Sequence, residues 1–264
     1  MRLAGLLIIR EGPGARWRAV RREIRRVGIL GLLDVAAFRA YSWLALSRRD
    51  AEWKAGELAR LKDTYPARLD DVPRLVVANP NAPEAQAFLE RVRPDLAIAR
   101  CKVILRPAIY GIPSMGTYVL HPGICPEYRN AHGCFWALAN GDRERVGMTL
   151  LKVDAGIDTG PIYLHASYAF DEHRESHLVI QYRVVTENLA AIGRTLLALY
   201  RGEEVPPVST VGRQSATWGQ PRLSTYVRWK STEGRSIETR APEADTERGA
   251  APVRTAADRA EMVP

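Results

Sequence analysis

Short apolar runs alternate with longer stretches of helical periodicity over the first three quarters of the chain. The runs are bounded by Pro, Gly or charged residues, which is typical of short strands. We predict strands at 3–9, 74–78, 95–99, 117–120, 147–153 and 162–168. We predict helices at 16–61 with a break near 28–31, at 83–91, at 132–140 and at 174–200. Strands alternating with helices predict an α/β fold with a Rossmann-like, mainly parallel sheet.

The periodicity ends after Pro206, and this change divides the chain into three parts. Residues 1–205 are expected to form one α/β domain. Residues 206–230 are expected to be an ordered extension, in which Trp218, Tyr226 and Trp229 either anchor the segment on the domain or recognise a substrate. Residues 231–264 are rich in Glu, Arg, Ala, Thr and Pro and have little to bury, so we predict a disordered tail.

Composition indicates a globular protein, with 46% hydrophobic and 26% charged residues in 264. Part of the net charge of +8 comes from a dense arginine run between residues 16 and 26. No aromatic and glycine signature of an RNA-binding module accompanies it, so nucleic acid is not an expected partner. Three cysteines form no paired framework, and the apolar run at 3–9 ends at Arg10. We expect a cytoplasmic protein.

Residues 27–46 are about twenty in number and largely apolar, but Asp34 and Arg39 interrupt them. Each charge near the middle of a membrane span costs about 2.5–3.5 kcal/mol on insertion scales. The segment is therefore expected to be an amphipathic helix that packs on the domain or rests on a membrane surface. With the preceding arginines, Trp17 and Trp43, residues 16–46 are the candidate region for peripheral membrane contact.

Candidate chemistry lies where predicted strands end. His121 directly follows the strand at 117–120, and ligands of such sheets bind beyond the carboxyl ends of strands. Asp158 lies in the turn-rich run Gly-Ile-Asp-Thr-Gly-Pro at 156–161. A histidine that donates or accepts a proton, with a carboxylate beside it, suits acyl transfer. A zinc site built from His121, Cys125, His132 and Cys134 is not expected, because their spacing differs from that of paired metal knuckles.

Three motifs occur together: His-Pro-Gly-Ile-Cys-Pro-Glu-Tyr-Arg at 121–129, Gly-Met-Thr at 147–149 and the 156–161 run. Their order and spacing resemble those of the folate-dependent formyltransferase family, which includes glycinamide ribonucleotide and methionyl-tRNA formyltransferases. The catalytic trio of that family is Asn-x-His plus Asp. His121 and Asp158 match it, whereas Val119 stands at the position of the asparagine.

The resemblance implies a reaction and a donor. It implies transfer of a formyl group from 10-formyltetrahydrofolate to an amine, with His121 stabilising the oxyanion and Asp158 handling the proton. It places the pterin ring of the donor against two segments, represented here by Val103, Ile104 and Leu105 and by Val153, Asp154 and Gly156. From the residues alone, the apolar triplet at 103–105 is more typical of core than of a ligand wall.

Val119 has no polar atom, and loss of one oxyanion donor typically costs about 100- to 1,000-fold in rate. Asn130 and His132 are the candidates to compensate for the missing donor.

The glycinamide ribonucleotide acceptor is not expected, because the phosphate-binding Gly-Ser-Asn turn is absent after the first strand. An amino-sugar nucleotide is the suggested acceptor. The alternatives are a formyltetrahydrofolate hydrolase, which uses water as acceptor, and a folate- or nucleotide-binding module that has lost activity.

Overall fold

The computed structural model describes residues 2–10, 12, 14–66 and 69–238. Residues 1–229 form one compact unit, and a second unit begins at Lys230. The last described helix, α8 (Leu223–Glu238), continues past residue 231, where the predicted tail begins. The remainder of that tail, 239–264, lies outside the described residues.

The six predicted strands are present and belong to two sheets. A two-stranded parallel sheet pairs β1 (Leu6–Ile9) with β2 (Arg74–Val77). A four-stranded sheet has the order β3 (Leu96–Ala99), β4 (Gly116–His121), β6 (Met148–Lys152) and β7 (Ile162–Ala166). In it β3 and β4 are parallel, whereas β4, β6 and β7 pair antiparallel. Short β5 (Arg129–Asn130) and β8 (Thr217–Trp218) form a further parallel pair. The α/β fold with mainly parallel pairing is confirmed.

The predicted N-terminal helical stretch is also confirmed. It consists of α1 (Ala15–Tyr41), a π-helical turn η1 (Ser42–Leu46) and α2 (Ser47–Thr64). Gly28 interrupts α1 with φ 72° and ψ −179°, a conformation that glycine adopts without a Cβ penalty. Shorter helices follow in chain order: α3 (Pro83–Val92), α4 (Pro107–Tyr110), α5 (Gly133–Ala139) and the 3-10 turn η2 (Arg143–Arg145).

The prediction of one helix over 174–200 is wrong, because the segment forms α6 (His177–Thr186) and α7 (Leu189–Tyr200). Asn188 lies between them with φ −107° and ψ 13°, outside helical geometry. Its Nδ2 donates to the Val184 and Ser167 carbonyls, so the side chain ties the break to the end of β7. Polar side chains that bond locally to the backbone compete in this way with helix continuation.

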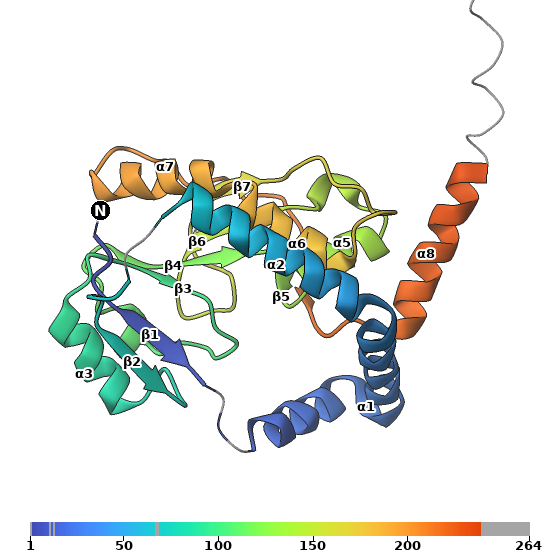
Figure 1. The fold of residues 1–264 in the computed structure, drawn as a ribbon, viewed down its shortest axis with the longest axis horizontal. Coiled ribbons are helices and arrows are strands. Elements are labelled where there is room, and N and C mark those ends of the chain that lie inside the picture. Colours follow the sequence, from blue (N-terminus) through green and yellow to red (C-terminus); the bar gives the residue numbers. More distant parts are fainter. Residues whose placement is uncertain (1, 11, 13, 67–68, 239–264) are drawn as a thin grey trace, which may run out of the picture. The chain divides into compact units, whose positions relative to one another are not determined.

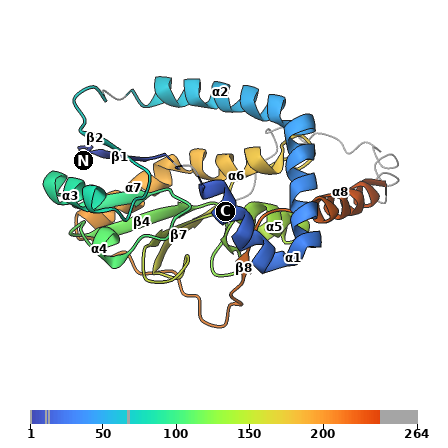
Figure 2. The same cartoon turned by 90° about the horizontal axis from the view of Figure 1, so that it is seen from below.

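The packing of helices on the four-stranded sheet forms the core. Helices α6 and α7 lie along the sheet, and α2 lies over α6 (Figures 1 and 2). Trp53 of α2 stacks there on Tyr182 of α6. Helix α5 is buried along almost its whole length. Aromatic side chains of the 206–230 extension join this core, among them Trp218, Tyr226 and Trp229. The extension is therefore anchored on the domain, and the buried sheet holds the end of β4 in place.

Candidate active site

His121 is the last residue of β4, and its side chain is only 4% exposed. Its Nε2 lies 2.7 Å from the Tyr128 carbonyl oxygen. A carbonyl can only accept a hydrogen bond, so Nε2 must carry the proton that it donates there. In the neutral ring Nδ1 then carries a free lone pair. The chain thus fixes which ring nitrogen is available for chemistry.

Asp158 occupies the loop between β6 and β7 and faces that free nitrogen. Its Oδ2 lies 3.5 Å from His121 Nδ1 and accepts a 2.8 Å hydrogen bond from the Asn130 backbone N–H. Asp158 has φ 51°, in the left-handed region that residues other than glycine seldom adopt. Arg129 steadies the loop, because its Nη1 donates to the Ile157 carbonyl at 3.0 Å.

The two side chains form a site for one proton. Neutral His121 presents a lone pair to an ionised Asp158, so a proton that arrives between them is held by both groups. Asp158 Oδ2 also accepts the Asn130 backbone N–H, which holds the carboxylate in place beside the ring. Both side chains are shielded from solvent, which strengthens their electrostatic interaction. The arrangement suits uptake of a proton from a nucleophile.

The turn that follows His121 is fixed by a buried threonine. Thr149 Oγ1 donates to the Gly123 carbonyl at 2.7 Å and accepts from the Cys125 N–H at 3.0 Å. Gly123 has no room for a side chain, since a Cβ there would lie 2.5 Å from the Tyr128 carbonyl oxygen and 2.7 Å from His121 Nε2. The backbone therefore passes close enough for the Tyr128 carbonyl to hold the imidazole.

Asp158 lies in a second tight loop that depends on small residues. Asp154 accepts hydrogen bonds from the Gly156 N–H at 2.9 Å and the Thr159 hydroxyl at 2.8 Å. A Cβ on Gly160 would lie 1.9 Å from the Lys152 carbonyl oxygen, so only glycine fits at that position. Val153, predicted to contact the donor, anchors the start of the loop by donating its N–H to the Thr117 carbonyl at 2.7 Å.

Val119 lies two residues before His121 on β4, so both side chains lie on the same face of the strand. Position 119 is the one at which the formyltransferase pattern has its asparagine. Val119 instead packs against an apolar cluster of Cys125, Leu151 and Ile162. The site lacks a polar side chain at this point.

The two residues predicted to compensate are engaged elsewhere. Asn130 Nδ2 donates to the Trp218 carbonyl at 2.5 Å, and only the backbone N–H of Asn130 reaches Asp158. His132 precedes α5 and lines a cavity of about 400 Å³ with Ser42 and Asp50. The structure joins His121 to Asp158, but it does not direct the side chain of Asn130 or His132 towards that pair.

The apolar triplet at 103–105 is not core, which corrects the expectation from the residues alone. Val103 is 38% exposed and Ile104 is 60% exposed, while Leu105 is partly buried. The segment is a loop held by Asn81, whose Nδ2 donates to the Ile104 carbonyl and whose Oδ1 accepts from the Arg106 N–H. Apolar side chains kept at the surface by a braced loop fit the wall of a ligand site.

Trp218 anchors the extension on the domain, which is one of the two roles predicted for it, but the sequence did not reveal its partners. Its ring lies between Tyr128 and Trp136, with ring centroids at 5.7 Å and 4.8 Å, and its Nε1 donates to the Glu127 carbonyl. Its carbonyl accepts from Asn130. The only signal in the sequence is an aromatic residue followed by Gly219 in a segment without periodicity, which identifies no partner.

The thiols near the site are inert in this geometry. Burial raises the pKa of Cys125 to about 12, and the negative charge of Asp158 acts in the same direction. Burial likewise raises the pKa of Cys134 to about 12. Thiolates are the nucleophilic and metal-binding form of cysteine, so neither side chain is prepared for such a role. Across the described ranges, no three His, Cys, Asp or Glu side chains gather in a way that could hold a metal ion.

The Thr149 hydroxyl is expected to stabilise the fold as well as the turn. Thr149→Val keeps the shape of the side chain but leaves the Cys125 N–H and the Gly123 carbonyl without their partner. The free energy of unfolding should fall by about 1–3 kcal/mol. Thr149→Ser, which keeps the hydroxyl, should recover most of that loss in urea titrations. Equal stability of Thr149→Val and the parent chain would contradict this role.

Stability should also fall in mild acid because of His132. Burial lowers the pKa of His132 to about 4, and the positive charge of Arg39 acts in the same direction. The unfolded chain takes up the proton below about pH 6.5, whereas the folded chain does so only near pH 4. The free energy of unfolding should therefore decrease by roughly 3 kcal/mol as the pH falls through that window.

Urea titrations at several pH values test this linkage. His132→Gln should show a flatter pH profile than the parent chain, because one group whose pKa is lowered by folding is gone. Substitution of the exposed His173 by Gln is the matched control and should leave the profile unchanged. A profile of His132→Gln as steep as that of the parent chain would show that His132 is not the source.

Parts of this chain are similar in sequence to known proteins. Methionyl-tRNA formyltransferase of Dehalococcoides mccartyi (strain CBDB1) is 35% identical over 116 residues, 44% of this chain and 35% of the relative. Methionyl-tRNA formyltransferase of Thermotoga maritima is 37% identical over 106 residues, 40% of this chain and 34% of the relative. The alignments thus span about a third of the length of these curated relatives.

Solved structures show more distant similarity. A sugar N-formyltransferase from Shewanella sp FDAARGOS_354 aligns with a TM-score of 0.46 and 14% identity, covering 86% of this chain and 87% of that one. Phosphoribosylglycinamide formyltransferase from Anaplasma phagocytophilum aligns with a TM-score of 0.45 and 15% identity, covering 60% and 76%.

A family model described as formyl transferase matches residues 51–196, more than half of the chain. The matched segment contains β4, the turn after His121 and the Asp158 loop. The chain therefore belongs to the formyl transferase family.

Proposed function

We propose that this protein transfers a formyl group from 10-formyltetrahydrofolate to an amine, with His121 and Asp158 as the catalytic residues. The observation that carries the proposal is the pair itself, in which His121 Nδ1 faces Asp158 Oδ2 at 3.5 Å while Nε2 is held by a carbonyl. Membership in the formyl transferase family supports the proposal that the group transferred is a formyl group. Amino-sugar nucleotides are the first acceptor class to test, followed by methionyl-tRNA.

The amine loses a proton as it attacks the formyl carbon, and the pair supplies the place for it. The proton moves to His121 Nδ1, where Asp158 Oδ2 shares it. The imidazolium that results has both N–H groups directed, one to the Tyr128 carbonyl and one to Asp158, and its positive charge would lie beside the reacting oxygen. Negative charge on that oxygen is therefore countered at the moment when the ring becomes positive.

The donor would lie against the exposed loop residues. In 10-formyltetrahydrofolate the formyl unit is an amide of N10, the nitrogen that bridges the pterin and the aminobenzoyl group, and this nitrogen would take up a proton when the acyl bond breaks. Val103, Ile104 and Leu105 supply an apolar wall at a braced loop, and the backbone of Val153, Asp154 and Gly156 supplies the second segment. Exclusion of water by such walls favours transfer to an amine over hydrolysis.

Val119 favours a second candidate function, a folate-binding module without catalysis. Its side chain belongs to an apolar cluster and cannot donate to the formyl oxygen. One observation speaks against this alternative: Asp158 has a strained backbone and lies beside His121. A binding module has little use for a strained carboxylate held against a histidine. A formyltetrahydrofolate hydrolase would use the same pair with water in place of the amine.

Restoring the missing donor tests the proposal. We expect Val119→Asn to raise the rate of formyl transfer by about 100-fold, because the amide would be the oxyanion donor that the strand position provides. Conversion of 10-formyltetrahydrofolate to tetrahydrofolate is followed with amino-sugar nucleotides and methionyl-tRNA as acceptors. A reaction without acceptor measures hydrolysis. His121→Gln should lower the rate by at least about 100-fold.

Val208→Asn is the matched control, because Val208 packs on the same apolar cluster but lies outside β4. Val208→Asn should lower the free energy of unfolding about as much as Val119→Asn does, and it should leave the rate of formyl transfer unchanged. Equal rates for Val119→Asn and Val208→Asn, together with full activity of His121→Gln, would exclude His121 and its strand from the reaction.

A further inference from the structure

The outward face of α1 and η1 is apolar. Five large side chains of this face are between 59% and 83% exposed: Ile29, Leu30, Leu33, Trp43 and Leu44. Ala36, Ala37 and Ala40 lie among them and are also exposed. Positions 30, 33, 37, 40 and 44 are three or four residues apart, so they share one side of a helix. We call these eight residues the apolar stripe.

The opposite side of the same helix is held by the protein. Val35 and Phe38 are buried, and Phe38 packs on Phe135 and Tyr226. The two charged residues of this segment are also bonded to the domain, because Asp34 accepts from the Ser224 N–H and hydroxyl and Arg39 donates to Gln220. The helix is thus already anchored on the domain. The apolar stripe is what this anchoring leaves facing outward.

Scattered apolar side chains are normal on protein surfaces, but a continuous stripe of this length is not. The most apolar window of the Val20–Thr64 helical stretch has a mean hydropathy of 1.5, and only 11% of it is buried. The stripe also lies before residue 51, where the match to the formyl transferase family begins. It is therefore separate from the residues that form the candidate active site.

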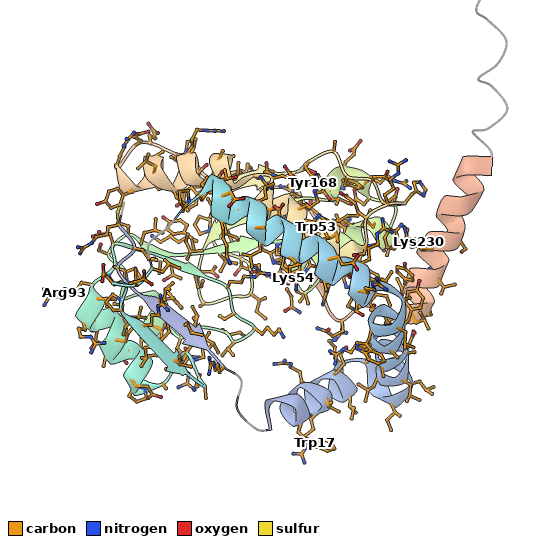
Figure 3. The ribbon with its side chains drawn as sticks, in the orientation of Figure 1. Trp17, Trp53, Lys54, Arg93, Tyr168 and Lys230 are labelled. Atoms are coloured by element: carbon orange, nitrogen blue, oxygen red, sulfur yellow. The ribbon has the colours of Figure 1, made fainter. Side chains whose placement is uncertain are left out.

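The charges around the apolar stripe indicate which partner binds it. Basic side chains flank the stripe, with exposed Arg21, Arg22 and Arg25 before it and Arg48 after it. Between residues 24 and 49 Asp34 is the only acidic residue, and it is bonded to Ser224. Trp17 projects outward from the first half of α1 (Figure 3), and Trp43 lies near the other end. Arginines and tryptophans around an apolar helix face are typical of helices that lie in the interface of anionic membranes.

A second copy of this chain fits the stripe less well. Two helices paired along this face would bring the arginines at 21–25 of one copy near either the same arginines or Arg48 of the other. Like charges would then meet at both ends of the contact.

We propose that the apolar stripe docks the protein on an anionic lipid surface, with the axis of the helix in the plane of the membrane. A spanning orientation would break the bonds of Asp34 to Ser224 and of Arg39 to Gln220 and place both charges in lipid. The in-plane orientation keeps these bonds and buries only the outward side chains. It leaves the remaining surface of the domain in water.

Vesicle sedimentation with the full chain tests the docking. The protein should sediment with vesicles of phosphatidylcholine and phosphatidylglycerol in equal parts, and weakly with phosphatidylcholine alone. Combined Leu30→Ser, Leu33→Ser and Leu44→Ser substitutions should lower the partition coefficient at least about tenfold. Combined Leu3→Ser, Leu58→Ser and Leu69→Ser substitutions change three exposed leucines elsewhere and should leave partition within about twofold of the parent chain.

Circular dichroism and thermal unfolding show whether each variant is folded before vesicles are added. Arg21→Gln, Arg22→Gln and Arg25→Gln together should remove the preference for phosphatidylglycerol and most of the salt dependence of binding.

Failure of the folded parent chain to sediment with either vesicle, or equal partition of both leucine variants, would overturn the proposal. So would a dimer in analytical ultracentrifugation that the stripe variant dissociates without any vesicle binding. Resistance of the membrane-bound protein to alkaline carbonate extraction would overturn the in-plane orientation.

Discussion

The hydrogen bond from His121 Nε2 to the Tyr128 carbonyl decides what the site can do. It spans 2.7 Å between buried atoms and leaves Nδ1 as the reactive nitrogen. Asp158 can serve the ring only because that nitrogen faces its Oδ2. With the opposite ring orientation, the carboxylate would meet a carbon atom and the proton would have no shared position. The proposed reaction therefore depends on the position of a single main-chain carbonyl.

That carbonyl is fixed by contacts from distant parts of the chain. Thr149, on β6, holds the turn from one side through its buried hydroxyl. Trp218, on β8, holds it from the other side by stacking on Tyr128 and donating to the Glu127 carbonyl. The backbone of Asn130 links the same turn to Asp158. Trp218 of the 206–230 extension thus supports the candidate active site without being placed in the proposed reaction.

The sequence predicted the strands and the break near Gly28, because periodicity reports local structure. The pairing of His121 with Asp158 was implied by the resemblance of three motifs to the formyltransferase family. It did not predict that Asn130 Nδ2 bonds the Trp218 carbonyl, 88 residues away, because no local pattern records such a contact. The apolar triplet at 103–105 was ambiguous, because hydrophobicity does not show whether a loop braced by Asn81 keeps it at the surface. Periodicity likewise showed which residues of α1 share a face, but not which face is packed.

The two proposals concern separate parts of one chain, a formyl transfer site at the end of β4 and a lipid-docking face on α1. The claim that His121 and Asp158 serve a folate donor is central, and titration calorimetry with 10-formyltetrahydrofolate tests it without knowledge of the acceptor. We predict a dissociation constant in the micromolar range for the parent chain and weaker binding for Ile104→Asp, which places a charge in the apolar wall. Absence of binding at millimolar donor would contradict the assignment of this site.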